Sequence, residues 1–167
     1  MATGFGQRIH CIPLLAPTSY APNASWVTEH IDLKQFTDLE FHVNVGVLAS
    51  SGGTTWAVEP YCSSTTTAAG EKCGFMYCIS STAIGGDSMG SPTTASSTEY
   101  VSLTSNNSSE LLIVYIDPSL VEEIGSDKRY LYLTSTFTSD DNTSSLFSVV
   151  AYGIPRHKQA TMESATA

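Results

Sequence analysis

The feature that most constrains the fold of this chain is a strict alternation of apolar and polar residues in its C-terminal half. Between residues 129 and 138 every second residue is Tyr or Thr, and the residues between them are Leu, Ser or Phe. One side of an extended chain would carry Leu131, Leu133, Ser135 and Phe137, and the other Tyr130, Tyr132, Thr134, Thr136 and Thr138. Because successive side chains of a strand point to opposite faces, this pattern predicts a strand with one buried and one solvated face.

Two further predicted strands flank this segment. Residues 113–116 are apolar and end at Asp117-Pro118, and residues 146–154 alternate and end at Pro155. Turn-forming Ser, Asp and Asn residues at 139–142 separate the last two strands. The acidic segment near 119–124 predicts no more than about one helical turn.

The N-terminal half repeats the pattern most clearly at residues 38–48. There Leu39, Phe41, Val43, Val45 and Val47 alternate with Glu40, His42, Asn44 and Gly46. Further strands are predicted at 4–12, 25–33, 55–62, 73–80 and 99–103, and residues 81–97 are predicted to form a long loop. We therefore expect an all-β fold, an antiparallel, jelly-roll-like β-sandwich of about eight strands with almost no helix. An immunoglobulin-type sandwich is the competing topology, but its Cys…Trp…Cys order is absent because Trp56 precedes Cys62.

The length of 167 residues predicts one folded domain. We expect an N-terminal extended arm or first strand at 1–24, the β-sandwich domain at 25–156 and a polar C-terminal tail at 157–167. Pro60 suggests that the strand at 55–62 is an edge strand or carries a bulge. The predicted core contains Leu39, Phe41, Val43, Val45, Leu112, Val114, Leu131, Leu133 and Phe137.

The charge of the chain argues against two classes of partner. The net charge is −9, from 16 acidic and 7 basic residues. Nucleic-acid binding and docking to an anionic membrane both depend on basic patches, so neither is expected. No apolar run approaches the ~20 residues that span a bilayer. No secretory signal is expected at the N-terminus, and folding in a reducing cytoplasm is predicted.

The four cysteines give no metal-binding spacing. Cys73 and Cys78 would lie on opposite faces of a regular strand and are predicted not to bond to each other. Cys62 and Cys73 could meet across a hairpin, or all four could be free thiols that act as small hydrophobic residues.

No residue pattern indicates catalysis, a cofactor or a metal. Glu122-Glu123 and the nearby Asp127 form an acidic group that is better explained as a solvated turn than as an acid–base pair. Asp140-Asp141-Asn142 could bind calcium but lacks the spacing of a dedicated calcium loop, which favours a hairpin loop. His42 lies on the polar side of its strand, and no GxSxG nucleophile motif is present. The chain is therefore not expected to be an enzyme.

Two regions are candidates for interaction with other proteins. The outward Tyr130 and Tyr132 form part of either an ordinary solvated face or an adhesive surface. The N-terminal segment is apolar and poor in charge, and its apolar residues are expected to bury against a neighbouring subunit or a larger protein surface, or to close the chain's own sheet as a first strand. These residues are Ile9, Ile12, Leu14, Leu15 and Tyr20.

Two segments resemble a known family. Residues 31–46 start with Ile-Asp-Leu, pass through a short turn and continue as F-x-V-x-x-G. Residues 113–156 contain an apolar strand, a D-x-x-L turn, a Y-L-x-L strand and an apolar strand that ends in Pro-Arg. Both resemble tailed-phage head decoration (cement) proteins of jelly-roll type, although the region 62–97 is longer and richer in Cys, Gly and Ser than in that family.

The resemblance implies a structural virion protein on the outside of the capsid, made in the host cytoplasm. The expected partners are the major capsid protein lattice and further copies of the chain, as a dimer or trimer. It implies no activity, cofactor or catalytic residue. The alternative is a carbohydrate-binding or lectin-like module, in which Trp26 and Trp56 would be stacking platforms; a hydrolase is the least supported class.

Overall fold

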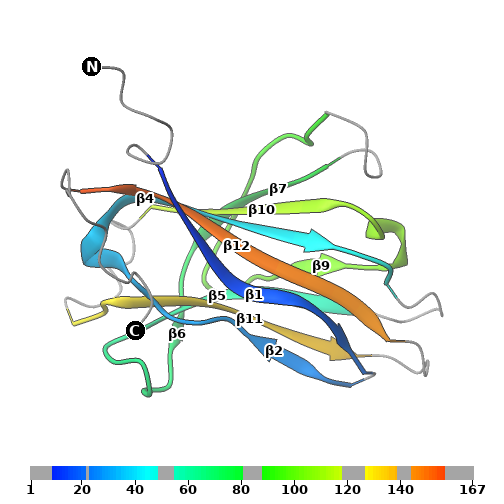
Figure 1. Cartoon of the computed structure of the whole chain (residues 1–167), viewed down its shortest axis with the longest axis horizontal. Helices are drawn as coiled ribbons and strands as arrows, with labels where there is room; N and C mark the ends of the chain where they lie inside the picture. Colours follow the sequence, from blue (N-terminus) through cyan, green and yellow to red (C-terminus); the bar gives the residue numbers. More distant parts are fainter. Residues whose placement is uncertain are drawn as a thin grey trace.

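A computed structural model describes residues 9–21, 23–48, 55–80, 88–117, 127–138 and 144–156 of the chain. The described residues form two antiparallel six-stranded sheets that pack face to face as a sandwich (Figure 1). Sheet A contains, in spatial order, β1 (His10–Tyr20), β12 (Ser145–Pro155), β4 (Phe36–Val45), β10 (Leu111–Ile116), β7 (Phe75–Ile79) and β8 (Thr93–Ala95). Sheet B contains β2 (Ser25–Val27), β3 (Ile31–Asp32), β11 (Tyr130–Thr138), β5 (Thr55–Ser63), β6 (Glu71–Lys72) and β9 (Val101–Leu103).

Sheet B is built on one long central pair of strands. β11 and β5 are in register from Tyr130 opposite Ser63 to Thr138 opposite Thr55. β2 and β3 both pair with the outer edge of β11, and β6 and β9 both pair with the outer edge of β5. The edges of sheet B therefore consist of short, interrupted strands, which offer little unpaired backbone to other chains.

The strand order is that of a jelly roll. If β2 and β3 count as one strand and β6, β7 and β8 are set aside, eight strands remain along the chain. The first pairs with the last (β1–β12), the second with the seventh (β2/β3–β11), the third with the sixth (β4–β10) and the fourth with the fifth (β5–β9). These are the pairs of one long hairpin, and rolling it up places β12 beside β4 and β11 beside β5. The expected all-β, jelly-roll-like sandwich is thus confirmed.

The core lies between the inner faces of the two sheets, and the alternation identified it correctly. All nine residues predicted from the sequence are buried. Trp56 is fully buried near the middle, where its ring stacks on Phe137 with centroids 4.3 Å apart and meets Phe147 edge-on at 4.6 Å. Each such large side chain contributes roughly 1.5–3 kcal/mol by leaving water.

A partly buried ion pair joins β3 to the residue that precedes β11, its neighbour in sheet B. Asp32 accepts hydrogen bonds from Nε and Nη2 of Arg129, which immediately precedes β11. The same carboxylate caps the 3-10 turn η2 (Leu33–Gln35) by accepting from the backbone N–H of Lys34. This arrangement fixes the turn between β3 and β4, because one carboxylate satisfies both the turn and the guanidinium.

The N-terminal segment differs from its expected form. The sequence indicated a strand at 4–12 followed by a loop or arm, whereas β1 continues to Tyr20. Pro13 and Pro17 do not interrupt it because β1 is an edge strand that pairs only with β12. Register shifts on both sides of Leu15 absorb the irregularity.

Three other expectations need correction. β4 ends at Val45 although the strand was predicted to reach residue 48, and Val47, which continues the alternation, is 64% exposed. The predicted loop at 81–97 contains β8, and Met89 forms a bridge with Ser80. Pro60 lies inside β5 rather than on an edge strand. Its carbonyl accepts a hydrogen bond from the backbone N–H of Cys73, in the gap between the β9 pairing at residues 56–58 and the β6 pairing at residues 61–62. Because neither β9 nor β6 pairs with Pro60, the lack of a backbone N–H at this residue costs no ladder hydrogen bond.

Several predictions fall outside the described residues. These are the start of the first strand at 4–8, the helical turn near 119–124 and the tail at 157–167. In the part of the chain that the structure describes, no helix is long and apolar enough to cross a membrane.

Candidate interaction surface

The outer face of sheet A carries two rows of mostly apolar side chains that cross five strands. Strand register places the members of each row directly beside one another, since neighbouring strands are paired residue by residue. The first row is Pro13, Val150, His42, Ile113 and Cys78, and the second is Cys11, Tyr152, Glu40, Tyr115 and Met76. We call these ten residues the sheet A outer face.

This face is turned toward solvent: Cys11, Pro13, Glu40 and Met76 are exposed, and the other six residues are half-buried. Met76 is 39% exposed, and beyond the two rows Leu146 and Ile154 of β12 are 42% and 46% exposed on the same side. The outer face of an antiparallel sheet is usually polar, because only its inner face packs on the core. Contiguous exposed apolar surface of this kind marks interaction sites in soluble proteins.

The polar groups of this face contact each other within it. His42 Nε2 lies 3.3 Å from Glu40 Oε2, and the His42 ring meets Tyr152 edge-on at 4.6 Å. Tyr115 donates its hydroxyl to Asp38 Oδ1 at 3.1 Å. Burial, followed by that hydrogen bond and the nearby carboxylates, raises the pKa of Tyr115. The face therefore presents aromatic rings together with carboxylate oxygens.

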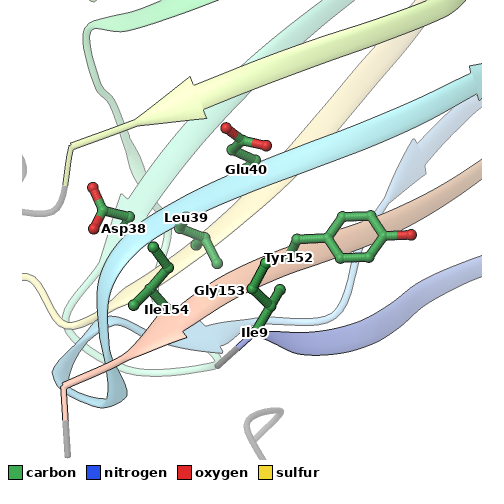
Figure 2. A pocket seen from close by; sticks show the side chains of 7 residues that line it. All are labelled: Ile9, Asp38, Leu39, Glu40, Tyr152, Gly153 and Ile154. Carbon is green, nitrogen blue, oxygen red and sulfur yellow. The ribbon is translucent and has the colours of Figure 1, made fainter. Parts of the chain in front are cut away.

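A shallow groove of about 110 Å³ opens at one end of the sheet A outer face (Figure 2). Its floor is the Gly153–Leu39 pair of β12 and β4, where both residues face the core and leave backbone toward solvent. Tyr152 and Ile154 of β12 flank this floor on one strand, Asp38 and Glu40 of β4 flank it on the other, and Ile9 closes the side toward β1. The groove surface is thus almost entirely apolar, and the carboxylates of Asp38 and Glu40 lie at its rim on the side toward β10.

The outer face of sheet B is different in kind, because its charges are paired within the chain. Lys72 Nζ lies 2.7 Å from Glu59 and 6.0 Å from the centroid of the Tyr61 ring. Tyr61 also donates its hydroxyl to Glu59. Lys128 pairs with Glu71 at 2.9 Å. These short-range pairs leave little net charge for an external partner.

The structure separates the seven interaction residues predicted from the sequence. Ile12 and Leu14 are buried in the chain's own core, and Leu15 and Tyr20 pack against it. Their apolar character therefore has an explanation inside the chain, through β1 as a first strand of sheet A. Ile9 alone of the five lines the groove. Whether any of them contacts another protein stays a prediction.

The predicted tyrosines lie on the outer face of sheet B, but Tyr132 is used internally. Its ring lies between His30, at 4.4 Å, and Tyr61, at 5.7 Å, and its hydroxyl accepts from the backbone N–H of Gly70. Tyr130 is half-buried beneath the guanidinium of Arg129, whose Cζ atom lies 5.2 Å from the centroid of the Tyr130 ring. These contacts favour a structural role for both rings within sheet B.

The residues proposed for sugar stacking are not on the surface. Trp26 is 2% exposed and Trp56 is fully buried, so neither ring can present a platform to a glycan. The acidic groups at 122–123 and 140–142 lie outside the described residues. Among the residues that are described, no three His, Cys, Asp or Glu side chains gather as a metal site would require.

The cysteines occupy different environments. Cys62 and Cys73 are both buried beside the β5–β6 hairpin, while Cys78 pairs with Ile113 in sheet A. All four are free thiols. The Cys62 thiol beside it, together with burial, raises the pKa of Cys73.

The sheet A outer face was missed by the sequence reasoning, although a signal for it was present. The segment Leu111–Ile116 is apolar at six consecutive positions instead of alternating. In β12 the outward positions Val150 and Tyr152 are as apolar as the inward ones. A strand that is apolar on both sides indicates that both faces are covered.

The chain was compared with protein-family models and with the sequences of curated proteins. No family model matches the chain, and no curated protein matches its sequence.

Proposed function

We propose that the protein is a structural virion protein, a decoration or cement protein that binds the outer surface of a phage head and stabilises it. The observation that carries this proposal is the sheet A outer face, an apolar surface on an otherwise well-packed sandwich. A cement protein must be rigid and adhesive on one side, and a jelly roll with one apolar and one polar outer face meets that requirement.

The resemblance to phage head proteins supports the proposal at the level of particular strands. The segment 31–46 corresponds to β3, η2 and β4, and the segment 113–156 contains β10, β11 and β12. These elements include three neighbouring strands of sheet A that carry most of the apolar outer face. The divergent region 62–97 supplies β6, β7 and β8, which are additions to the eight jelly-roll strands.

The proposed partners are the major capsid protein lattice and further copies of the chain, as a dimer or trimer. The proposed location is the capsid exterior after synthesis in the host cytoplasm, and no catalytic activity is assigned. We assign the proposed adhesive surface to sheet A rather than to Tyr130 and Tyr132, because contacts with His30 and Tyr61 engage the Tyr132 ring within the chain.

The proposal is tested with phage heads assembled without this chain. Added protein should sediment with the heads in a saturable manner and raise the temperature at which they release DNA. Heads that neither bind the protein nor gain stability would exclude the cement function. Sedimentation equilibrium of the protein alone should give a dimer or trimer mass.

A further inference from the structure

Among the residues that the structure describes, the acidic groups of the sheet A outer face have no lysine or arginine beside them on that face. Asp38 and Glu40 both belong to β4, and only His42 among the described outward strand positions could carry a positive charge. His42 contacts Oε2 of Glu40, and Tyr115 contacts Oδ1 of Asp38. Within the described residues the second oxygen of each carboxylate remains for a hydrogen bond from outside.

Most of the basic residues that the structure describes are engaged elsewhere in the fold, and Lys34 lies exposed in η2, where its charge helps to lower the pKa of Asp32. Lys72, Lys128 and Arg129 pair with Glu59, Glu71 and Asp32 on sheet B. Arg156 donates from Nε to the carbonyl of Phe36. The chain as a whole carries a net charge of −9.

A second copy of this chain is therefore a poor occupant for this face. A two-fold contact centred on these residues would place Glu40 and Asp38 of one copy near the same carboxylates of the other, and like charges at an interface cost several kcal/mol. A partner that supplies both apolar surface and positive charge satisfies the rings and the carboxylates together.

The groove at Gly153 has the composition that suits a long basic side chain. The aliphatic stem of lysine or arginine packs on apolar walls while its charged end reaches a carboxylate. Sheet B already contains this combination within the chain, where Lys72 lies over Tyr61 and binds Glu59. In the groove Tyr152 and Glu40 are a cross-strand pair that offers the same two groups, with Asp38 as a second acid.

We infer that the sheet A outer face docks on a protein surface that is apolar at its centre and carries lysine or arginine, one side chain of which enters the groove between Tyr152, Ile154, Asp38 and Glu40. This inference rests on the proposed function in that the partner would be the capsid lattice, and it adds the chemistry by which that partner is recognised.

The groove is tested first with small probes that mimic one side chain. Amide NMR shifts of the full chain are followed during titration with n-butylammonium, 1-butanol and butyrate. The ammonium should give saturable shifts at 38–40 and 152–154, and the alcohol and the anion should bind at least threefold more weakly. Equal shifts with 1-butanol, or no saturable shift with the ammonium, would overturn the inference.

Charge variants supply the matched comparison. Glu40→Gln and Asp38→Asn should each weaken n-butylammonium binding at least threefold. Glu29→Gln removes the same charge from an exposed position between β2 and β3 and should leave binding unchanged. An equal effect of all three would mean that only net charge matters, which contradicts a site at the groove.

Binding to phage heads separates this inference from the proposed function. If the wild-type protein binds heads, added NaCl and Glu40→Gln should both weaken binding. If the wild-type protein binds heads and neither NaCl nor Glu40→Gln weakens binding, the cement function stands and the inference of a basic partner surface is wrong. If the ammonium probe binds the groove and heads do not bind, the groove chemistry stands and the cement function is wrong.

Discussion

Gly153 of β12 lies directly against the ring of Phe36, the first residue of β4. A Cβ atom at position 153 would overlap Cδ1 and Cε1 of that ring, which is fully buried. The glycine is required here for space, since a side chain at this inward position would displace the Phe36 ring from the core.

Gly153→Ala should therefore destabilise the fold by about 1–3 kcal/mol through overpacking. Urea unfolding followed by tryptophan fluorescence measures the loss. Gly74→Ala is the control, because a Cβ there would meet only the carbonyl of Ala95 at an ordinary 3.5 Å. If both variants lose the same stability, the close contact with Phe36 does not decide the effect.

Phe41→Ala should cost about 3–5 kcal/mol, because the side chain is fully buried in the middle of β4 and its removal leaves a cavity. Thr136→Ala on the exposed side of β11 should change stability by less than about 1 kcal/mol. Chemical denaturation of both proteins checks the assignment. A loss below about 1 kcal/mol for Phe41→Ala would place that residue on the wrong face.

The Asp32–Arg129 pair should make stability fall in acid. Burial alone would raise the pKa of Asp32, but hydrogen bonds from Arg129 and the Lys34 backbone, with the charges of both residues, lower it below 3.8. The carboxylate therefore stabilises the fold above pH 3.8, and this contribution is lost as the pH falls through the lower folded value.

Asp32→Asn should consequently be least stable relative to wild type near neutral pH, and the difference should shrink below pH 3.8. Urea midpoints of both proteins at several pH values measure it. A difference that stays constant from pH 7 to pH 2 would show that the charge of Asp32 is not responsible.

The thiols should react in an order set by their burial. Cys11 is exposed, Cys78 is half-buried with a pKa raised by burial and then by Glu40, and Cys62 and Cys73 are buried. Under native conditions a thiol-specific disulfide reagent should modify Cys11 first, Cys78 more slowly, and Cys62 and Cys73 only after denaturation. Peptide mapping identifies the sites, with Cys11→Ser as the control; early labelling of Cys73 would contradict its place in the core.

The features that could be predicted from the sequence are those that depend on residues close together along the chain, namely the strands and their buried faces. The alternation of Leu39, Phe41 and Val43, and of Leu131 and Leu133, is a local consequence of strand geometry and identified the core directly. The count of strands and the absence of helical periodicity then favoured a sandwich.

The remaining features depend on contacts between distant segments. Pro13 and Pro17 suggested an irregular arm, and only the pairing of β1 with β12 as an edge strand makes them compatible with a strand. Val47 continued the alternation of β4, but β4 ends at Val45, where the backbone N–H bonds to Glu110. The apolar rows of the sheet A outer face arise from five strands, so their continuity is not visible along the chain.

The central claim is that the sheet A outer face binds phage heads. It is tested most directly by comparing threonine substitutions on the outer face of sheet A with a threonine substitution on the outer side of sheet B. Ile113→Thr/Val150→Thr removes apolar surface from the middle of that face and keeps β-branched residues in both strands. Val27→Thr makes the same kind of change on the outer side of sheet B, where Val27 is 53% exposed.

Binding isotherms to heads assembled without the chain are measured for wild type and both variants, after circular dichroism has confirmed that all three are folded. The account predicts that Ile113→Thr/Val150→Thr binds at least tenfold more weakly and that Val27→Thr binds like wild type. Equal binding by all three, or a loss with Val27→Thr alone, would contradict the assignment of sheet A as the docking face.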